Sequence, residues 1–371
     1  MILGIIKTRL PSNRSPLYVV CLILWLNGKL FAQEESRDSN MVVCLCADAD
    51  LSPAGVMLAH EHAKGFFKLS YAAMRMNMQH IFSGTDLIKE SNVFNSYLMA
   101  PTYMTMDMHM IMLMYGVTNR LSIMTMLGYN VNNMSMTSFA SSAGSTNVAS
   151  GGHSHGGGTG EMDMKSSGFG DTKIQASYQF VNNKLDVFGN IGLSLPTGNF
   201  YFSGEDNDAM YPNQRYPYSM QLGSGSFELL SGIVGLYSTG KLISGVQVNS
   251  IIRIHDNEIG YRKGDEINAN VWIAYKWLSW FSSSVRVNGV SESSINGLDA
   301  DLTAIMEPAA DYRNYGGNWL NFYLGANFYF NKSIFQDSKL AVEIGAPVYN
   351  NVSGMQMVAE YGGVFNWSFY F

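Results

Sequence analysis

Six methionines occupy every second position between Tyr103 and Tyr115: Met104, Met106, Met108, Met110, Met112 and Met114. Successive side chains of a β-strand point to opposite faces, so this spacing puts all six thioethers on one face. Thioether sulfur is soft and polarizable, and soft ligands select ions such as Cu(I). The run therefore predicts a strand with a sulfur-lined face that suits a soft metal ion or a pliable apolar contact.

The methionine pattern continues on the two neighbouring predicted strands. On each of these strands the methionines lie on the same face as polar residues such as Lys68 and Ser122, and the opposite face is apolar. The polar face of a membrane barrel points into the lumen, so we expect the methionines to line the lumen. The additional metal-ligand candidates on these strands are Met74, Met76, Met124 and Met126.

The opposite orientation, with the methionines facing the lipid, stays open at this point. If the methionines face the lumen, then Asp107 and His109, on the other face of the same strand, must face the lipid. A lipid-facing stripe would turn both polar side chains inward. With the stripe in the lumen, Asp107 reaches about the height of Arg75 on the adjacent strand, so the two can pair. His109 then has no assigned partner.

Histidine pairs outside the predicted wall are further candidate metal ligands. His60 and His62 precede the first strand, and His153 and His155 lie in the long Gly- and Ser-rich segment 132–167. The first pair lacks the H-E-x-x-H spacing of helical zinc sites. The alternative for each pair is a solvated tail or loop.

The composition suits a large β-structure in an apolar medium. The chain has 371 residues and only 14% charged residues, against roughly 25% in average soluble domains. Its net charge of −6 and lack of a basic run argue against nucleic acid as a partner. It has no Walker or dinucleotide motif, so we expect no enzyme. No cofactor is assigned with certainty, and Cu(I) is the only candidate.

Beyond residue 65, apolar and polar residues alternate with period two in twelve candidate strands, joined by short turns that alternate with longer loops. This is the pattern of a transmembrane antiparallel up-and-down β-barrel in the outer membrane, an all-β fold. The predicted strands are 66–78, 101–115, 120–131, 168–181, 184–195, 219–237, 241–255, 260–276, 279–291, 317–330, 338–349 and 355–371.

The N-terminus predicts a secretory signal. Basic residues precede the apolar run 17–26, and a small-residue site lies before Gln33, so we assign 1–32 to a signal peptide. An uncleaved membrane anchor is the alternative, but the run is shorter than the roughly 20 residues that a spanning helix needs. Residues 33–65 are then a periplasmic segment and 66–371 the barrel. Cys44 and Cys46 can be free, bridged between chains, lipidated or metal-bound.

The C-terminal run from Phe365 to Phe371 alternates aromatic residues and ends in phenylalanine. It resembles the last strand of Gram-negative outer-membrane proteins, whose terminal aromatic residue is read by the barrel assembly machinery. The resemblance implies that the barrel assembly machinery binds this protein through Phe371. It also implies that the lipid bilayer of the outer membrane surrounds the barrel.

Three glycine-rich strand-end motifs, Gly168-Phe-Gly-Asp171, Leu193-Ser-Leu-Pro-Thr-Gly198 and Gln221-Leu-Gly-Ser-Gly225, follow one another along the chain. Their order resembles the outer-membrane family labelled as part of the meta-cleavage pathway of phenol degradation. That family is treated as a channel or transporter. The methionine stripe departs from its broad pattern and resembles a methionine-rich branch.

Three functions follow from these observations. The first is a porin-like outer-membrane conduit that handles a soft metal ion, most readily Cu(I), along the methionines. The second is a channel for small hydrophobic or aromatic molecules, in which the methionines form an adaptable apolar lining. The third is a structural or adhesive barrel whose loops contact a partner.

Overall fold

A computed structural model describes residues 50–59, 63–138, 161–204, 214–330 and 337–371. The strands of the wall are β1 (Phe67–Gly84), β3 (Met99–Thr118), β4 (Leu121–Ser138), β5 (Glu161–Phe169), β6 (Thr172–Val181), β7 (Leu185–Leu195), β8 (Glu228–Ser238), β9 (Leu242–Arg253), β11 (Glu266–Leu278), β12 (Phe281–Glu292), β14 (Gly317–Phe330) and β15 (Ser338–Tyr370). Short elements in the connections are β2 (Asp86–Ile88), α2 (Glu90–Val93), η2 (Tyr218–Met220), β10 (Tyr261–Arg262), β13 (Asn296–Gly297) and η3 (Pro308–Ala310).

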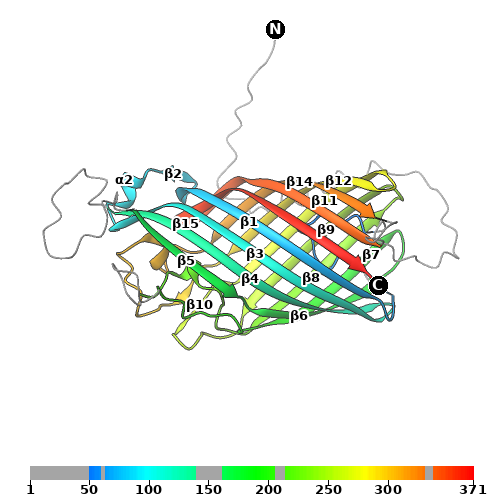
Figure 1. Cartoon of the computed structure of the whole chain (residues 1–371), viewed down its shortest axis with the longest axis horizontal. Helices are drawn as coiled ribbons and strands as arrows, with labels where there is room; N and C mark the ends of the chain where they lie inside the picture. Colours follow the sequence, from blue (N-terminus) through cyan, green and yellow to red (C-terminus); the bar gives the residue numbers. More distant parts are fainter. Residues whose placement is uncertain (1–49, 60–62, 139–160, 205–213, 331–336) are drawn as a thin grey trace, which may run out of the picture. The chain divides into compact units, whose positions relative to one another are not determined.

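The wall is a closed antiparallel ring, because β15 pairs with β1 (Figure 1). β5 and β6 together form one wall strand beside β4. β15 crosses the wall twice, since residues 338–352 pair with β14 and residues 352–370 pair with β1. Ten strands cross once and β15 crosses twice, so the predicted twelve-stranded barrel is confirmed.

Alternation of side chains decides which face of each strand meets the lipid. On β3, Met110 and Met112 are 4% and 6% exposed, whereas Ile111 and Leu113 are 55% and 47% exposed. The methionine face of β3 therefore points into the barrel. The other strands present a similar outer belt of exposed apolar side chains, which a bilayer would cover.

Aromatic side chains gather at the end with the short turns, as expected where a barrel meets the membrane interface. Phe67 and Tyr115 have ring centroids 4.6 Å apart, and Phe281 packs on Phe328 with centroids 5.4 Å apart. In the described part of the chain, no helix is long and apolar enough to cross a membrane.

Two predicted strands begin later than expected. The predicted strand 219–237 starts only at Glu228, because residues 214–227 turn into the barrel mouth, where hydrogen bonds to Asp171 hold Ser224. We call residues 214–227 the inward loop. The predicted strand 260–276 is also wrong at its start: β10 pairs with β13 outside the wall, and β11 begins at Glu266.

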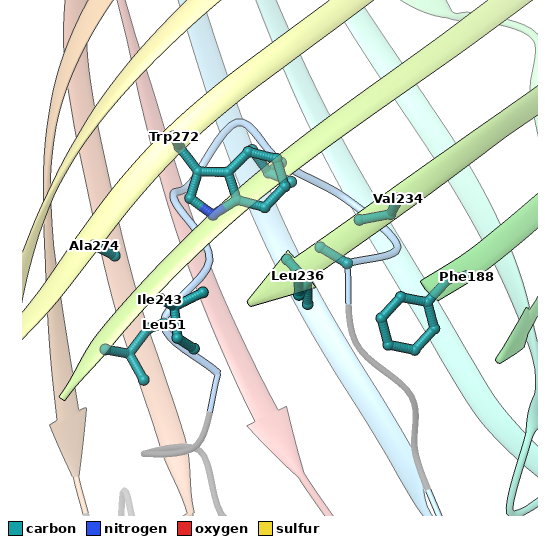
Figure 2. Packing of buried hydrophobic residues seen from close by; sticks show 9 residues of the cluster. Leu51, Phe188, Val234, Leu236, Ile243, Trp272 and Ala274 are labelled. Atoms are coloured by element: carbon teal, nitrogen blue, oxygen red, sulfur yellow. The ribbon is translucent and has the colours of Figure 1, made fainter. Parts of the chain in front are cut away.

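Residues 50–59, which we call the inserted segment, pack inside the barrel near the end where β1 begins. Lys339 Nζ donates to the carbonyl of Ser52 over 2.8 Å, and Gln247 Nε2 donates to that of Met57 over 2.7 Å. Figure 2 shows Leu51 of this segment near Ile243 of the wall, in a buried cluster that also includes Trp272. These contacts place residues 50–59 within the barrel.

Candidate functional site

A central cavity of about 500 Å³ lies inside the barrel, and the inward loop lines one end of it. One side of it is lined mainly by the thioether groups of methionine side chains. Methionines of β1, β3, β4 and β15 line this side: Met74, Met76, Met78, Met104, Met106, Met108, Met110, Met126, Met134, Met355 and Met357.

Strand register brings these methionines face to face. Met74 lies directly opposite Met108, Met76 opposite Met106, and Met78 opposite Met104 across the β1–β3 pair. Directly opposed residues of antiparallel strands have Cβ atoms about 4.5–5.5 Å apart. The sulfur atoms therefore form a continuous, deformable apolar surface along this side of the cavity.

The facing wall carries charge. Arg253 Nε lies 3.0 Å from Glu228 Oε1, and both side chains are buried. Lys263, between β10 and β11, lines the same side; burial and the nearby Arg253 guanidinium lower the pKa of its ammonium group. A solute in the cavity would touch thioethers on one side and paired charges on the other.

The inserted segment packs against methionines at one end of the cavity, Met110 and Met126, and we call this segment the floor. Leu58 packs with the methionines at the short-turn half of the stripe, among them Met112 and Met114. Gly55 lies against the Arg286–Glu343 ion pair, where an added Cβ would overlap the Arg286 guanidinium. The floor thus makes apolar contacts with the sulfur surface and polar contacts with the rest of the wall.

The inward loop forms the roof, and Asp171 holds it. Asp171 Oδ2 accepts hydrogen bonds from Ser224 N (2.8 Å) and Oγ (2.7 Å), and Oδ1 accepts one from Gly198 N (2.9 Å). Gly198 and Gly223 pack backbone against backbone, where a Cβ on either would clash. The three glycine-rich motifs therefore converge on one contact, which sequence spacing alone could not indicate.

The predicted metal ligands on the wall all face the barrel interior. Four of the six methionines of β3 line the central cavity with Met74, Met76 and Met126, whereas Met112, Met114 and Met124 face the inserted segment. The other candidates, His60, His62, His153 and His155, lie outside the described residues. Within those residues, no three His, Cys, Asp or Glu side chains gather as a metal site.

The polar residues on the lipid-facing side of the wall have hydrogen-bond or ion-pair partners. Arg75 Nε lies 2.8 Å from Asp107 Oδ1, and Nη2 donates to Oδ2 over 2.9 Å, so the anticipated ion pair is confirmed. His109 Nδ1 lies 2.7 Å from the hydroxyl of Tyr71. This partner of His109 was not anticipated.

No family model matches the sequence, and a search of curated proteins finds no match. Among solved structures, the COG4313 outer membrane channel from Pseudomonas putida F1 is similar, with a TM-score of 0.53 and 13% identity over 84% of this chain and 98% of that chain. The transport unit of the autotransporter AIDA-I from Escherichia coli (TM-score 0.44, 8% identity, 87% and 96% covered) is more distant. So is the P. putida toluene transporter TodX (0.39, 9%, 84% and 91%). The shared fold is that of an outer-membrane β-barrel, as predicted.

Proposed function

We propose that this barrel is an outer-membrane channel for small molecules with an apolar or aromatic part, which bind in the central cavity. The observation that carries the proposal is the two-sided lining, with thioethers opposite the Glu228–Arg253 ion pair. Cavities of about 300–1,000 Å³ with mostly apolar walls and a few polar groups are typical of small-molecule sites.

The size of the cavity favours a molecule over a bare ion. A metal ion needs only two to four donor atoms close together, whereas the cavity of about 500 Å³ is lined by eleven methionines. Flexible thioether side chains repack around ligands of different shape and make favourable contacts with aromatic rings. The charged wall would orient a polar substituent such as a phenolic hydroxyl.

Uptake of a phenol into liposomes that contain the folded barrel tests this proposal. Met106 and Met108 line the cavity, so changing both to tryptophan should fill it and reduce uptake several-fold, whereas Met→Leu at both should leave uptake nearly unchanged. Ile111→Trp is the matched control, because Ile111 lies on the same strand and faces lipid. Uptake that is indifferent to the tryptophan pair would contradict the proposal.

A second function, transfer of a soft metal ion along the stripe, is favoured by the directly opposed methionine pairs. Each pair offers two thioether donors at one level of the wall, and successive pairs offer a path. Competition for Cu(I) against a chromophoric chelator distinguishes the two functions. Here Met→Leu at Met74, Met106 and Met108 should lower the number of Cu(I) ions bound per barrel, although the same change should spare phenol uptake.

We further infer that the chain is a diverged member of the phenol-degradation meta-pathway channel family. The convergence of its three strand-end motifs on Asp171 supports this inference. Cleavage after residue 32 and recognition of Phe371 by the assembly machinery also remain proposals. N-terminal sequencing of the mature protein and deletion of Phe371 test them.

A further inference from the structure

A second, much smaller cavity lies at the long-loop end of the barrel, apart from the central cavity. Its volume is about 20 Å³, enough for a single water-sized occupant. We call it the methionine chamber. Its lining includes five thioethers and one carboxyl group, those of Met99, Met136, Met162, Met164, Met306 and Glu307.

Separate parts of the chain bring these side chains together. Met136 lies directly opposite Met162 across the β4–β5 pair. The Met99 amide donates to the carbonyl of Met306 over 2.8 Å, which fastens the loop before η3 to the start of β3. Backbone pairing therefore fixes the chamber on at least two sides, and the thioethers need only rotate their ends to meet an occupant.

Glu307 is the unusual member of the chamber. Its side chain is 5% exposed, and its Oε2 has no hydrogen-bond partner. Arg215 also borders the chamber, but its guanidinium pairs with Asp299 and Asp301 at 3.4 and 3.1 Å.

A buried carboxylate without a partner is costly, and either a proton or a bound cation removes that cost. Thioether sulfur accepts soft cations, and a single negative charge balances a single positive one. The donor set therefore fits a soft monovalent cation better than Ca²⁺ or Mg²⁺, which require several oxygen ligands.

We propose that the methionine chamber binds one soft monovalent cation, Cu(I) or Ag(I), through two or three thioethers and the Glu307 carboxylate. The site has a lining of its own, distinct from that of the central cavity. It also shares no residue with the methionines of the central cavity, so each can be removed by itself.

The test uses the full-length barrel in detergent micelles and silver nitrate in chloride-free buffer, because Ag(I) needs no reductant. Equilibrium dialysis measures bound Ag(I) per barrel for the parent and for a variant with Met136, Met164 and Met306 changed to leucine. The matched control changes Met112, Met114 and Met124 to leucine, which are buried but face the inserted segment. Heat-modifiable gel mobility confirms that each variant is folded.

We expect the chamber variant to lose one tightly bound Ag(I) that the control retains. The isosteric change Glu307→Gln should weaken that site at least about tenfold, as changes around metal ligands commonly do. X-ray absorption of the parent should show sulfur neighbours, reduced in number in the chamber variant. Equal tight binding by parent and chamber variant, or loss of this Ag(I) in the control instead, would overturn the proposal, whatever the outcome of the phenol experiment.

Discussion

Asp50 Oδ1 lies 3.1 Å from Nζ of Lys339, and its Oδ2 lies 3.6 Å from Nζ of Lys68, inside the barrel. The hydroxyl of Tyr370 donates to Oδ2 over 2.9 Å. All of these side chains are largely buried. One carboxylate thus joins the inserted segment to the first and last strands of the wall, where the ring closes.

Asp50→Asn should release the inserted segment. Removing one partner of a buried ion pair commonly costs about 3–5 kcal/mol, because the remaining charge is left without compensation. We expect the segment to leave the barrel for part of the time and single-channel conductance in planar bilayers to rise several-fold. Asp256→Asn is the control, since Asp256 pairs with Arg262 at 3.5 Å on the exposed loops. Equal conductance of Asp50→Asn and parent would show that this contact does not hold the floor closed.

Gly55→Ala should loosen the same floor by a different mechanism. The new methyl group would overlap the Arg286 guanidinium, which is bound to Glu343. Overpacking of this kind costs about 1–3 kcal/mol. Gly235→Ala is the matched control, because a Cβ at that wall position meets no atom within 4 Å. Hydrogen exchange of the amide of Val56 should be faster in Gly55→Ala only; unchanged exchange would mean that the segment tolerates the added volume.

The wall of this protein could be predicted because its determinants are local. Alternation along each strand, the parity of the methionines and the matching heights of Arg75 and Asp107 all follow from the geometry of neighbouring strands. The late start of β8 at Glu228 could not be found in this way, since residues 219–227 also alternate in part.

The floor and roof of the cavity could not be predicted because their contacts join distant parts of the chain. Asp50 and Tyr370 are separated by 320 positions, and Asp171 and Ser224 by 53. Neither aspartate lies in a periodic pattern that would indicate its partner. The methionine chamber was missed for the same reason, because Met306 and Glu307 belong to a loop with no strand signal.

Asp107→Ala should destabilise the barrel by leaving Arg75 unpaired on the lipid-facing wall. A lone arginine on that face costs about 2–4 kcal/mol at mid-bilayer and roughly 0–1 kcal/mol near the interface, so the size of the effect reports the depth of Arg75. Urea unfolding in lipid vesicles measures it. The double change Arg75→Leu and Asp107→Leu should restore most of the loss, because apolar replacement of both partners is often neutral. A double variant as unstable as Asp107→Ala would show that the pair does more than neutralise charge.

Asp171→Ala should free the inward loop from the cavity mouth. The change removes acceptors from Gly198 N, Ser224 N and Ser224 Oγ, and a buried donor left unsatisfied costs about 1–3 kcal/mol. The amides of Leu222 and Gly223, which both donate to the carbonyl of Asn199 over 3.0 Å, should then exchange roughly tenfold faster or more.

Asp163→Ala provides the control for this experiment, because Asp163 Oδ1 accepts a hydrogen bond from Ser135 Oγ over 2.6 Å in an exposed setting. In Asp163→Ala, the amides of Leu222 and Gly223 should exchange at the same rate as in the parent. If Asp171→Ala also matches the parent, then the backbone contact between Gly198 and Gly223 holds the roof without the carboxylate. The corresponding change Gly223→Ala, which would drive a methyl group into Gly198, should then release the loop by itself.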